Sequence, residues 1–456
     1  MNKPMPTFTS RLAFILVAAG SAVGLGNIWA FPYVAGKNGG GGFVLVYIIA
    51  LALIAAPALM AELTLGRLGR GSPPTTLKRL QKAVGSKVSW SFFGWMGLIA
   101  NILVLSFYGV ISGQAMAYVW FAIEGQFSGL SASQVYGMDG SFKASFYGPL
   151  YWTLSFITIT CVIVAFDIRV GLERAGKFLM PMLFVLLLVL VGYAGIYGDM
   201  AAAVDFLFGF SDAHIDLKVI MEAVGQAFFT LSVGVGGLMM YAAYMGEDVN
   251  IARAALWIVL LDLSIALLAG LAIFPLVYSE GVDPAAGPGL VFVTLPILFA
   301  KLPGGMFMAV LFFLLLTFAA LTSSISMITS GVARFEEAGV NRVLSAIIVG
   351  VITMVLSMLT ILSFGPMADL YPFADIFPSL DGMTFFDLIR EGINNIILPV
   401  GGLAFVLMVG WGLKSDMINT ALKGSSPAFI SGLMIIWRYV VPVAIIALIS
   451  TAWFGH

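Results

Sequence analysis

The segment that decides the fold is residues 20–27, which read GSAVGLGN in the middle of an apolar run over residues 11–35. A run of this length suffices for a helix that crosses a membrane, which needs about 20 apolar residues. Three glycines within seven residues, followed by Asn27, interrupt the helical pattern deep in the span. Unwound backbone in lipid needs partners for its N–H and C=O groups, and a bound ion or substrate supplies them.

A second apolar run, residues 219–244, is interrupted in the same way, with FTLSVGVGG over residues 229–237. Glycines alone would equally well permit close packing of two helices. The polar neighbours Asn27, Thr230 and Ser232 instead favour unwinding around a site. The sequence therefore predicts two broken spans.

The composition of the whole chain points to lipid as its solvent. Of its 456 residues, 61% are hydrophobic and 10% are charged, and the mean hydropathy is +1.04. Ordinary soluble domains carry about 25% charged residues, so a soluble enzyme is nearly excluded. The net charge of −1 argues against a nucleic-acid partner. One cysteine, Cys161, and two histidines, His214 and His456, exclude a disulfide framework and a Cys- or His-based metal site.

Apolar segments of spanning length predict an all-α polytopic membrane protein with about eleven transmembrane helices. The predicted spans are residues 11–35, 42–66, 89–123, 148–166, 174–197, 219–244, 252–279, 306–333, 342–363, 386–412 and 428–454. Lys and Arg concentrate in the loop after the second span, and aspartate in the loops after the fifth and ninth. By the positive-inside rule, we expect a cytoplasmic N-terminus and, with an odd number of spans, a C-terminus outside the cell membrane.

The two broken spans stand first in two blocks of five spans, residues 11–197 and 219–412. Interrupted spans in matching positions indicate the midplane site of a secondary transporter. The N-termini of half-helices favour a carboxylate, and freed carbonyl oxygens favour a small cation. No phosphate-binding P-loop sequence is present, so we expect an anionic or zwitterionic solute driven by a cation rather than by ATP.

Polar groups inside the predicted spans are candidate functional residues. Glu62 is expected to be a structural anchor that accepts hydrogen bonds from unwound backbone. Asp262 has no Lys or Arg near it in its span, which favours a bound cation as its partner. The hydroxyls of residues 322–324 either bond back to carbonyls of the preceding turn or ligate Na⁺. Tyr108 is either an interface aromatic or a pocket hydroxyl.

Three stretches together resemble the neurotransmitter:sodium symporter family, and in particular its bacterial amino-acid transporters. They are GSAVGLGNIW over residues 20–29, GQAFFTLS over residues 225–232 and FAALTSS over residues 318–324. The resemblance implies a sodium-coupled symporter that works by alternating access, with an amino acid, sodium ions and the lipid bilayer as its partners and no enzymatic activity. An oligomeric state is not implied.

The resemblance also implies the domain organisation. Residues 1–456 would form a single transmembrane transporter domain of two inverted five-helix repeats, with helices 1 and 6 unwound. The repeats would be residues 11–197 and 219–412, followed by an additional helix at 428–454.

Two sodium sites are implied by the family motifs. The first would use Ala22, Asn27, Thr230 and Asp262. The second would use carbonyl groups and hydroxyls of Gly20, Val23, Ala319, Thr322 and Ser323. Chloride-dependent members of the family hold the anion with an Asn in span seven and a Ser one turn later. Here those positions are Asp262 and Ala266, so chloride is not expected to be needed. Whether Asp262 takes up a proton when sodium leaves is left open.

The implied substrate site lies between the broken spans. The substrate carboxylate would meet Gly26, Tyr108 and the first sodium, and its ammonium would meet carbonyls of span one and span six. Amine transporters of the family carry an aspartate at the position of Gly24, so this chain resembles the amino-acid branch. The full substrate-binding set is Ala22, Gly24, Gly26, Val104, Tyr108, Phe229, Thr230, Ser232, Val235, Ser323 and Met327.

The pocket and the outer gate depart from the family pattern. Val235 replaces a common pocket aromatic, so a neutral, hydrophobic L-amino acid is expected. Ala30 stands where an arginine is usual. Arg390, followed by Glu391, stands where the gate usually has an acid, and it is expected to meet Glu391, Asp387 or the substrate carboxylate. Two alternatives remain: a symporter of an acidic amino acid, and a substrate-gated channel or sensor on the same fold.

At the inner gate, Lys3, Met5 and Phe8 are the nearest counterparts of the usual Arg and Trp. This leaves the usual pairing with Glu337 open.

Overall fold

The computed structural model describes residues 7–210, 215–281, 289–374, 376–377 and 380–454. These residues form helices and connecting turns and contain no strand, as the all-α prediction requires. Nine helical runs in the described part are long and apolar enough to cross a membrane. They are Gly41–Gly69, Ser91–Ile123, Tyr147–Ala165, Arg169–Tyr197, Ile251–Ser279, Gly305–Glu337, Arg342–Phe364, Phe385–Gly412 and Pro427–Thr451. The bent pair Arg11–Ala22 and Gly26–Lys37 forms a tenth candidate span. Two shorter helices, Leu217–Thr230 and Gly237–Ala243, cover the remaining predicted span, residues 219–244, and neither alone is long enough to cross a membrane.

Five of these spans are single helices: α6 (Ser91–Ile123), α8 (Tyr147–Ala165), α13 (Ile251–Ser279), α15 (Gly305–Glu337) and α16 (Arg342–Phe364). The other four contain five-residue π-helical turns, which the apolar pattern did not predict. Their elements are α3 (Gly41–Ala50), η2 (Leu51–Ala55) and α4 (Ala56–Gly69); η3 (Arg169–Glu173) and α9 (Arg174–Tyr197); α17 (Phe385–Gly392), η6 (Ile393–Ile397), α18 (Leu398–Leu407) and η7 (Met408–Gly412); and α20 (Pro427–Ile435), η8 (Ile436–Val440) and α21 (Val441–Phe454).

The first broken span is divided where its sequence predicts. Helix α1 (Arg11–Ala22) ends before Val23, whose backbone is extended at φ −71° and ψ 114°. The chain then continues as η1 (Gly26–Ala30) and α2 (Phe31–Lys37), and the two halves are bent by 50°.

The sixth span is likewise divided, into α11 (Leu217–Thr230) and α12 (Gly237–Ala243). Between them the backbone turns left-handed at Ser232, Gly234 and Gly236, with φ of 51°, 100° and 79°. Left-handed residues cannot continue a right-handed helix, and glycine adopts that conformation at little cost. Ser232 is one of two non-glycine residues with positive φ in the described part of the chain.

The break in the sixth span is fixed by its neighbours. The fully buried Glu62 of α4 accepts hydrogen bonds from the N–H groups of Gly234 at 3.0 Å and Met239 at 3.1 Å. Glu62 is therefore the anchor that the sequence predicts.

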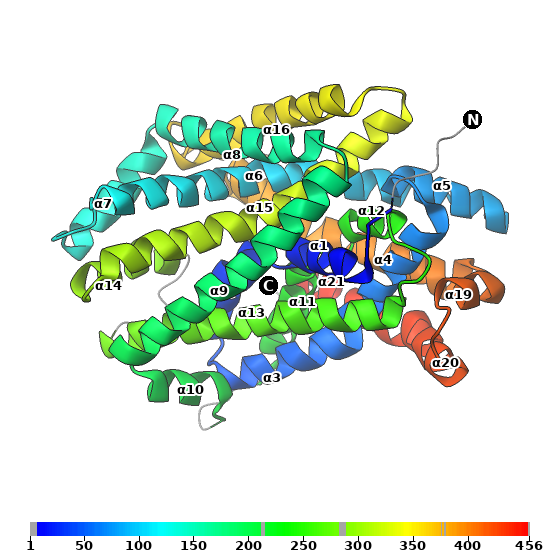
Figure 1. Cartoon of the computed structure of the whole chain (residues 1–456), viewed down its shortest axis with the longest axis horizontal. Coiled ribbons are helices and arrows are strands. Elements are labelled where there is room, and N and C mark those ends of the chain that lie inside the picture. Colours follow the sequence, from blue (N-terminus) through cyan, green and yellow to red (C-terminus); the bar gives the residue numbers. More distant parts are fainter. Residues whose placement is uncertain (1–6, 211–214, 282–288, 375, 378–379, 455–456) are drawn as a thin grey trace.

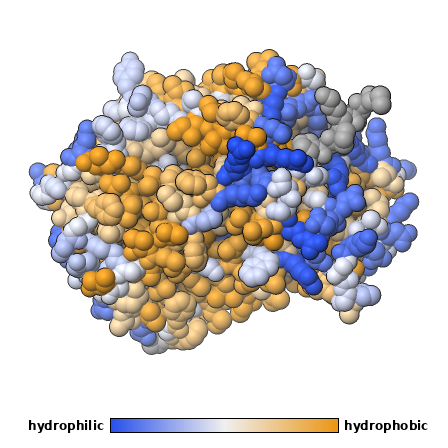
Figure 2. Space-filling model, in the orientation of Figure 1, coloured by the Kyte–Doolittle hydropathy of each residue, from blue (hydrophilic) through white to orange (hydrophobic). Residues whose placement is uncertain are grey.

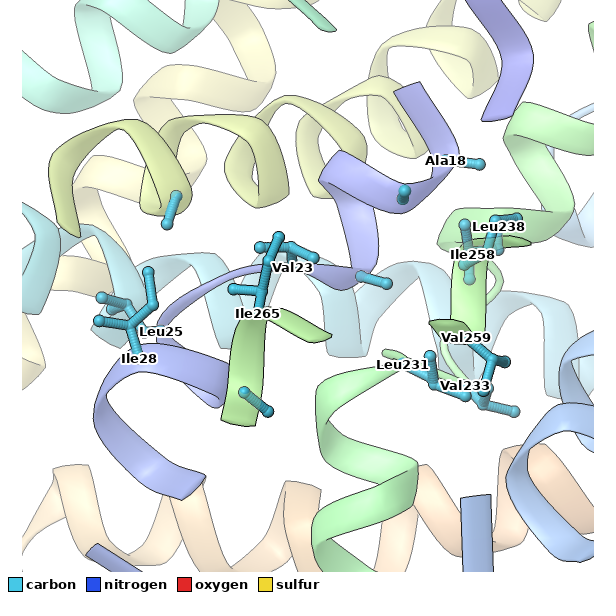
Figure 3. Close-up of a cluster of buried hydrophobic side chains, with 14 of the residues drawn as sticks. Ala18, Val23, Leu25, Ile28, Leu231, Val233, Leu238, Ile258, Val259 and Ile265 are labelled. Atoms are coloured by element: carbon cyan, nitrogen blue, oxygen red, sulfur yellow. The ribbon is translucent and has the colours of Figure 1, made fainter. Parts of the chain in front are cut away.

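Glycines in neighbouring helices bring their backbones against this break. A Cβ atom at Gly66, Gly97 or Gly401 would lie 2.1, 2.6 or 2.0 Å from a carbonyl oxygen of Met239, Val235 or Gly234. Figure 3 shows the apolar side chains around both breaks, including Val23 and Leu25 of the first and Leu231 and Val233 of the second. The breaks are thus polar backbone segments inside an apolar core.

Shorter helices gather at the two ends of the bundle (Figure 1). We call them the α5 end, with α5 (Pro73–Val84), α12 and α19 (Ser415–Ala421), and the α7 end, with α7 (Ala132–Ala144), α10 (Met200–Phe208) and α14 (Leu295–Lys301). The turn η4 (Leu290–Thr294) precedes α14. Figure 2 shows hydrophobic residues over the middle of the visible face and strongly hydrophilic residues concentrated toward the α5 end. The basic stretch after the second span, expected to be a loop, is largely the helix α5.

Candidate functional site

All eleven residues of the predicted substrate site line one small cavity of about 40 Å³ between the two broken spans. Asn101 and Leu398 also line it, and the sequence analysis missed them. Asn101 lies one and two turns before Val104 and Tyr108 on α6, so helical spacing could have identified it. Its side chain donates to the Val235 carbonyl at 2.9 Å, which ties α6 to the break in the sixth span. Leu398 is one apolar residue among many, and no sequence signal marks it.

Three predicted ligands of the first sodium site form one hydrogen-bonded cluster. Asn27 Oδ1 accepts from the Gly24 N–H at 3.1 Å, and its Nδ2 donates to Asp262 Oδ1 at 2.8 Å. Tyr47 Oη lies 3.3 Å from Thr230 Oγ1 and 3.4 Å from Asp262 Oδ2. Asp262 is fully buried and forms no ion pair in the described part of the chain. Oxygen atoms with one uncompensated carboxylate are suitable ligands for a hard cation.

The cluster also includes a residue that sequence reasoning missed. Tyr47 of α3 connects Thr230 with Asp262. A fully buried tyrosine in an apolar span has no sequence signal beyond its hydroxyl group. Ala22, the remaining predicted ligand, lines the adjoining small cavity.

The predicted residues of the second sodium site also meet. Thr322 Oγ1 lies 3.3 Å from the Val23 carbonyl oxygen and 2.9 Å from that of Ala319. Ser323 Oγ lies 3.1 Å from the Val23 carbonyl oxygen, and Thr322 packs against Gly20. Thr322 therefore bonds back along α15, as one of the two alternatives expected, and also faces the break in the first span; binding of Na⁺ by its hydroxyl stays a prediction.

Tyr108 is a pocket hydroxyl rather than an interface aromatic. Its Oη accepts from the N–H of Leu25 at 3.2 Å inside the first break. A Cβ atom at Gly24 would lie 2.7 Å from Tyr108 Oη and 2.5 Å from Ser323 Oγ. Gly24 therefore keeps open the space that these two hydroxyls face.

A second, larger cavity of about 760 Å³ adjoins the small one, and Phe229 and Leu398 line both. Ala30 and Arg390 lie in its wall. Arg390 Nη2 lies 2.6 Å from Glu391 Oε1. Of the partners expected from the sequence, Glu391 is therefore the one that Arg390 meets in this structure.

A second ion pair beside the larger cavity was not predicted from the sequence. Lys37 Nζ lies 2.8 Å from Glu222 Oε1, and the Asn38 side chain donates to Glu222 Oε2 at 2.8 Å. These contacts join the end of α2 to α11. Both broken spans are thus linked beside the larger cavity.

At the α5 end, Phe8 packs against the last residues of the sixth span. Its N–H donates to the Tyr244 carbonyl at 3.1 Å, and its ring contacts those of Tyr241 and Tyr244 edge-on. Glu337 instead accepts from the N–H of Ser72 at 2.7 Å. Lys3 and Met5 lie outside the described residues.

Comparison with known proteins decides the family. The sequence profile of the Sodium:neurotransmitter symporter family matches residues 5–142 and 131–452. The chain belongs to this family. The sodium-dependent transporter YhdH of Bacillus subtilis is 35% identical over 449 residues, which are 98% of this chain and 97% of YhdH. The sodium-dependent transporter MJ1319 of Methanocaldococcus jannaschii is 28% identical over 96% of this chain and 87% of its own length.

The fold comparison agrees with the sequence comparison. The crystal structure of MhsT in complex with L-phenylalanine matches with a TM-score of 0.89 and 37% identity, covering 98% of this chain and 100% of MhsT. The chain is therefore a sodium-dependent, multi-pass membrane transporter of this symporter family and not an enzyme. The predicted family and fold class are confirmed, whereas the repeat boundaries and the roles of individual residues stay predictions.

Proposed function

We propose that this transporter is a sodium-coupled symporter of a neutral, hydrophobic L-amino acid, working by alternating access without chloride. The observation that carries the proposal is the small cavity between the broken spans, bordered on two sides by the predicted sodium clusters. The unwound backbone at Gly26 and the hydroxyl of Tyr108 are suited to a carboxylate, and backbone carbonyls at the break in the sixth span to an ammonium. We also propose that the protein lies in the cell membrane with its α5 end on the cytoplasmic side.

The residues around the small cavity favour an apolar substrate side chain. Val104, Val235 and Met327 offer only apolar surface there. A cavity of about 40 Å³ is much smaller than an ordinary ligand pocket, which measures about 300–1,000 Å³. Phe229 borders both cavities, so its movement would join them and admit a larger side chain. The binding of L-phenylalanine by MhsT supports this substrate class.

Uptake into proteoliposomes tests the proposal. Each charge that moves through 100 mV is worth about 2.3 kcal/mol, and a tenfold gradient adds about 1.4 kcal/mol per ion. Two sodium ions would together supply about 7 kcal/mol, enough for roughly 10⁵-fold accumulation of a zwitterion. We expect concentrative, electrogenic uptake that needs sodium. Equal uptake with potassium would overturn the proposal, and sodium-dependent uptake that only equilibrates the substrate would favour a channel.

The Thr322→Ala variant is expected to raise the sodium concentration for half-maximal uptake about tenfold at fixed amino acid, since a buried hydroxyl contributes about 1 kcal/mol or somewhat more. The KM for the amino acid at saturating sodium should change much less. Ser324→Ala is the matched control, because Ser324 bonds to the Leu321 carbonyl and Thr160 instead of facing the break. Equal changes in both half-saturation values would contradict a direct role of Thr322 in binding sodium.

Enlarging Val235 is expected to reorder the substrates. Val235→Phe should disfavour the bulkiest amino acids by about 1–3 kcal/mol, the usual cost of overpacking. Competition of Trp, Phe, Leu and Val against a labelled substrate measures the ranking. An unchanged ranking would show that position 235 does not contact the substrate side chain.

The acidic-substrate alternative is testable in the same assay. Arg390 is paired with Glu391 and lines the larger cavity, not the small one. Glu and Asp should therefore compete poorly with hydrophobic amino acids. Competition at micromolar concentration would instead favour an acidic substrate.

A further inference from the structure

Two π-helical turns, η7 and η8, lie against each other near the α5 end. Gly410 permits this approach, because a Cβ atom there would lie 3.1 Å from the Trp437 carbonyl oxygen. Single π turns within α-helices occur frequently at functional sites. Neither turn contributes to the two cavities between the broken spans.

Arg438 of η8 is held in place at this junction. Its Nε donates to the Gly410 carbonyl at 2.8 Å, and its guanidinium carbon lies 5.4 Å from the centre of the Trp411 ring. Trp411 Nε1 in turn donates to the Arg438 carbonyl at 3.3 Å. The Tyr439 ring packs edge-on against Trp411 with centroids 5.8 Å apart. One edge of the guanidinium is thus used, and its Nη groups have no hydrogen-bond acceptor among the described residues.

Arg438 carries a positive charge for which the described residues supply no acidic partner. Arg438 is exposed and takes part in no ion pair within the described residues. In the sequence after Glu391, Asp416 is the only acidic residue. The surface around Arg438 is apolar, with Ile435 and Val440 exposed at 59% and 43%. Charges at a lipid-facing surface are ordinarily paired, which points to an anion from the membrane itself.

Arg438 is the twelfth residue of its own span, Pro427–Thr451, but its contacts with Gly410 and Trp411 bring it to the level at which the span Phe385–Gly412 ends. Trp411 lies one residue from the end of the span Phe385–Gly412 and is 59% exposed, and Tyr439 is 55% exposed. Trp and Tyr concentrate where the hydrocarbon meets the headgroups. Lys414, also exposed and unpaired within the described structure, follows Trp411 by three residues and adds a second positive charge.

We propose that Arg438, held in place by Trp411, and Lys414 bind the phosphate of an anionic phospholipid in the leaflet at the α5 end. The Nη groups of Arg438 form a fork that matches two phosphate oxygens, and basic pockets between spans on one side of a membrane bind acidic headgroups. The acyl chains would lie along the exposed side chains Val443 and Ile446 of α21. A zwitterionic headgroup fits less well, because its own cation meets the same two positive side chains.

Native mass spectrometry of the intact transporter with phosphatidylglycerol and phosphatidylcholine tests this assignment. We expect the wild type to retain phosphatidylglycerol preferentially, and Arg438→Gln to lower its affinity about fivefold, the value of one basic residue at a membrane surface. Arg253→Gln is the matched control. It removes an exposed cation at the start of α13 that, among the described residues, has no ion pair, aromatic contact or side-chain hydrogen bond. This control should bind phosphatidylglycerol like the wild type.

A second readout separates lipid binding from damage to the fold. In phosphatidylcholine nanodiscs, Arg438→Gln and wild type should melt at the same temperature, and phosphatidylglycerol should stabilise only the wild type and Arg253→Gln. If Arg438→Gln folds poorly, Arg438→Lys keeps the charge without the fork and should bind phosphatidylglycerol with intermediate affinity. Equal retention of the two lipids by the wild type would overturn the proposal. Equal losses of phosphatidylglycerol affinity in Arg438→Gln and Arg253→Gln would also overturn it. Displacement of the lipid by inorganic phosphate would overturn it as well, because it would show a site for a free anion.

Discussion

Replacing Asp262 by asparagine is expected to raise the sodium concentration for half-maximal uptake roughly 100-fold, since a hydrogen-bonded charge contributes about 1.5–3 kcal/mol. The substitution keeps the size of the side chain and removes the carboxylate of a fully buried cluster that contains Asn27 and Tyr47. Adding Ala266→Ser should make the double variant sensitive to chloride, because an external anion then replaces the missing charge. Uptake by reconstituted protein, with gluconate exchanged for chloride, measures both effects.

The single variant Ala266→Ser is the control for this experiment. With Asp262 in place, the new hydroxyl should leave uptake independent of chloride. Wild-type uptake that falls when gluconate replaces chloride would show that Asp262 does not stand in for the anion. An unchanged sodium requirement in Asp262→Asn would remove this residue from the first sodium site.

Truncating Glu62 is expected to cause the largest loss of stability. Glu62→Ala removes the acceptor of the Gly234 and Met239 N–H groups from a fully buried position. Hydrogen bonds to charged groups contribute about 1.5–3 kcal/mol each, so the expected loss is about 3–6 kcal/mol of unfolding free energy. Glu62→Gln keeps one acceptor oxygen, so its unfolding free energy should lie between those of the wild type and Glu62→Ala. Cys161 is the only cysteine and is half-buried, so its reaction with a thiol-reactive dye reports thermal unfolding.

Glu222→Gln provides the comparison for Glu62. It breaks a partly exposed ion pair with Lys37, and such pairs contribute about 0–1 kcal/mol. Its melting temperature should therefore stay close to that of the wild type. Similar melting temperatures for Glu62→Ala and the wild type would mean that the break in the sixth span holds its shape without the carboxylate.

The positions of the breaks and of the cavity between them were predictable, because glycine and polar residues are conspicuous in an apolar span. Residues 20–27 and 229–237 carry that signal in the sequence itself. The helix α5 was missed although its signals were present: Ser72 precedes two prolines, and Gly85 follows the last helical residue. Pro at the start and Gly just past the end are typical of helix boundaries.

Other features depend on contacts that a single sequence does not contain. The pair Lys37–Glu222 joins residues 185 positions apart, and Tyr47 reaches Asp262 across 215 positions. The π turns η7 and η8 lie where two helices meet, and their sequences, MVGWG and IWRYV, contain no pattern that predicts a π turn. Periodicity describes one helix at a time, so it cannot predict which faces of two helices touch.

The glycines that press against the break in the sixth span also limit how this transporter can evolve. Gly66, Gly97 and Gly401 touch backbone carbonyls, so any side chain there would push on atoms that cannot rotate away. If the small cavity binds the substrate as proposed, new substrate preferences are expected to arise through exchanges of cavity side chains such as those of Val104 and Met327, with the scaffold unchanged. A combinatorial library directed at the cavity lining should yield functional variants, whereas one directed at these glycines should yield almost none.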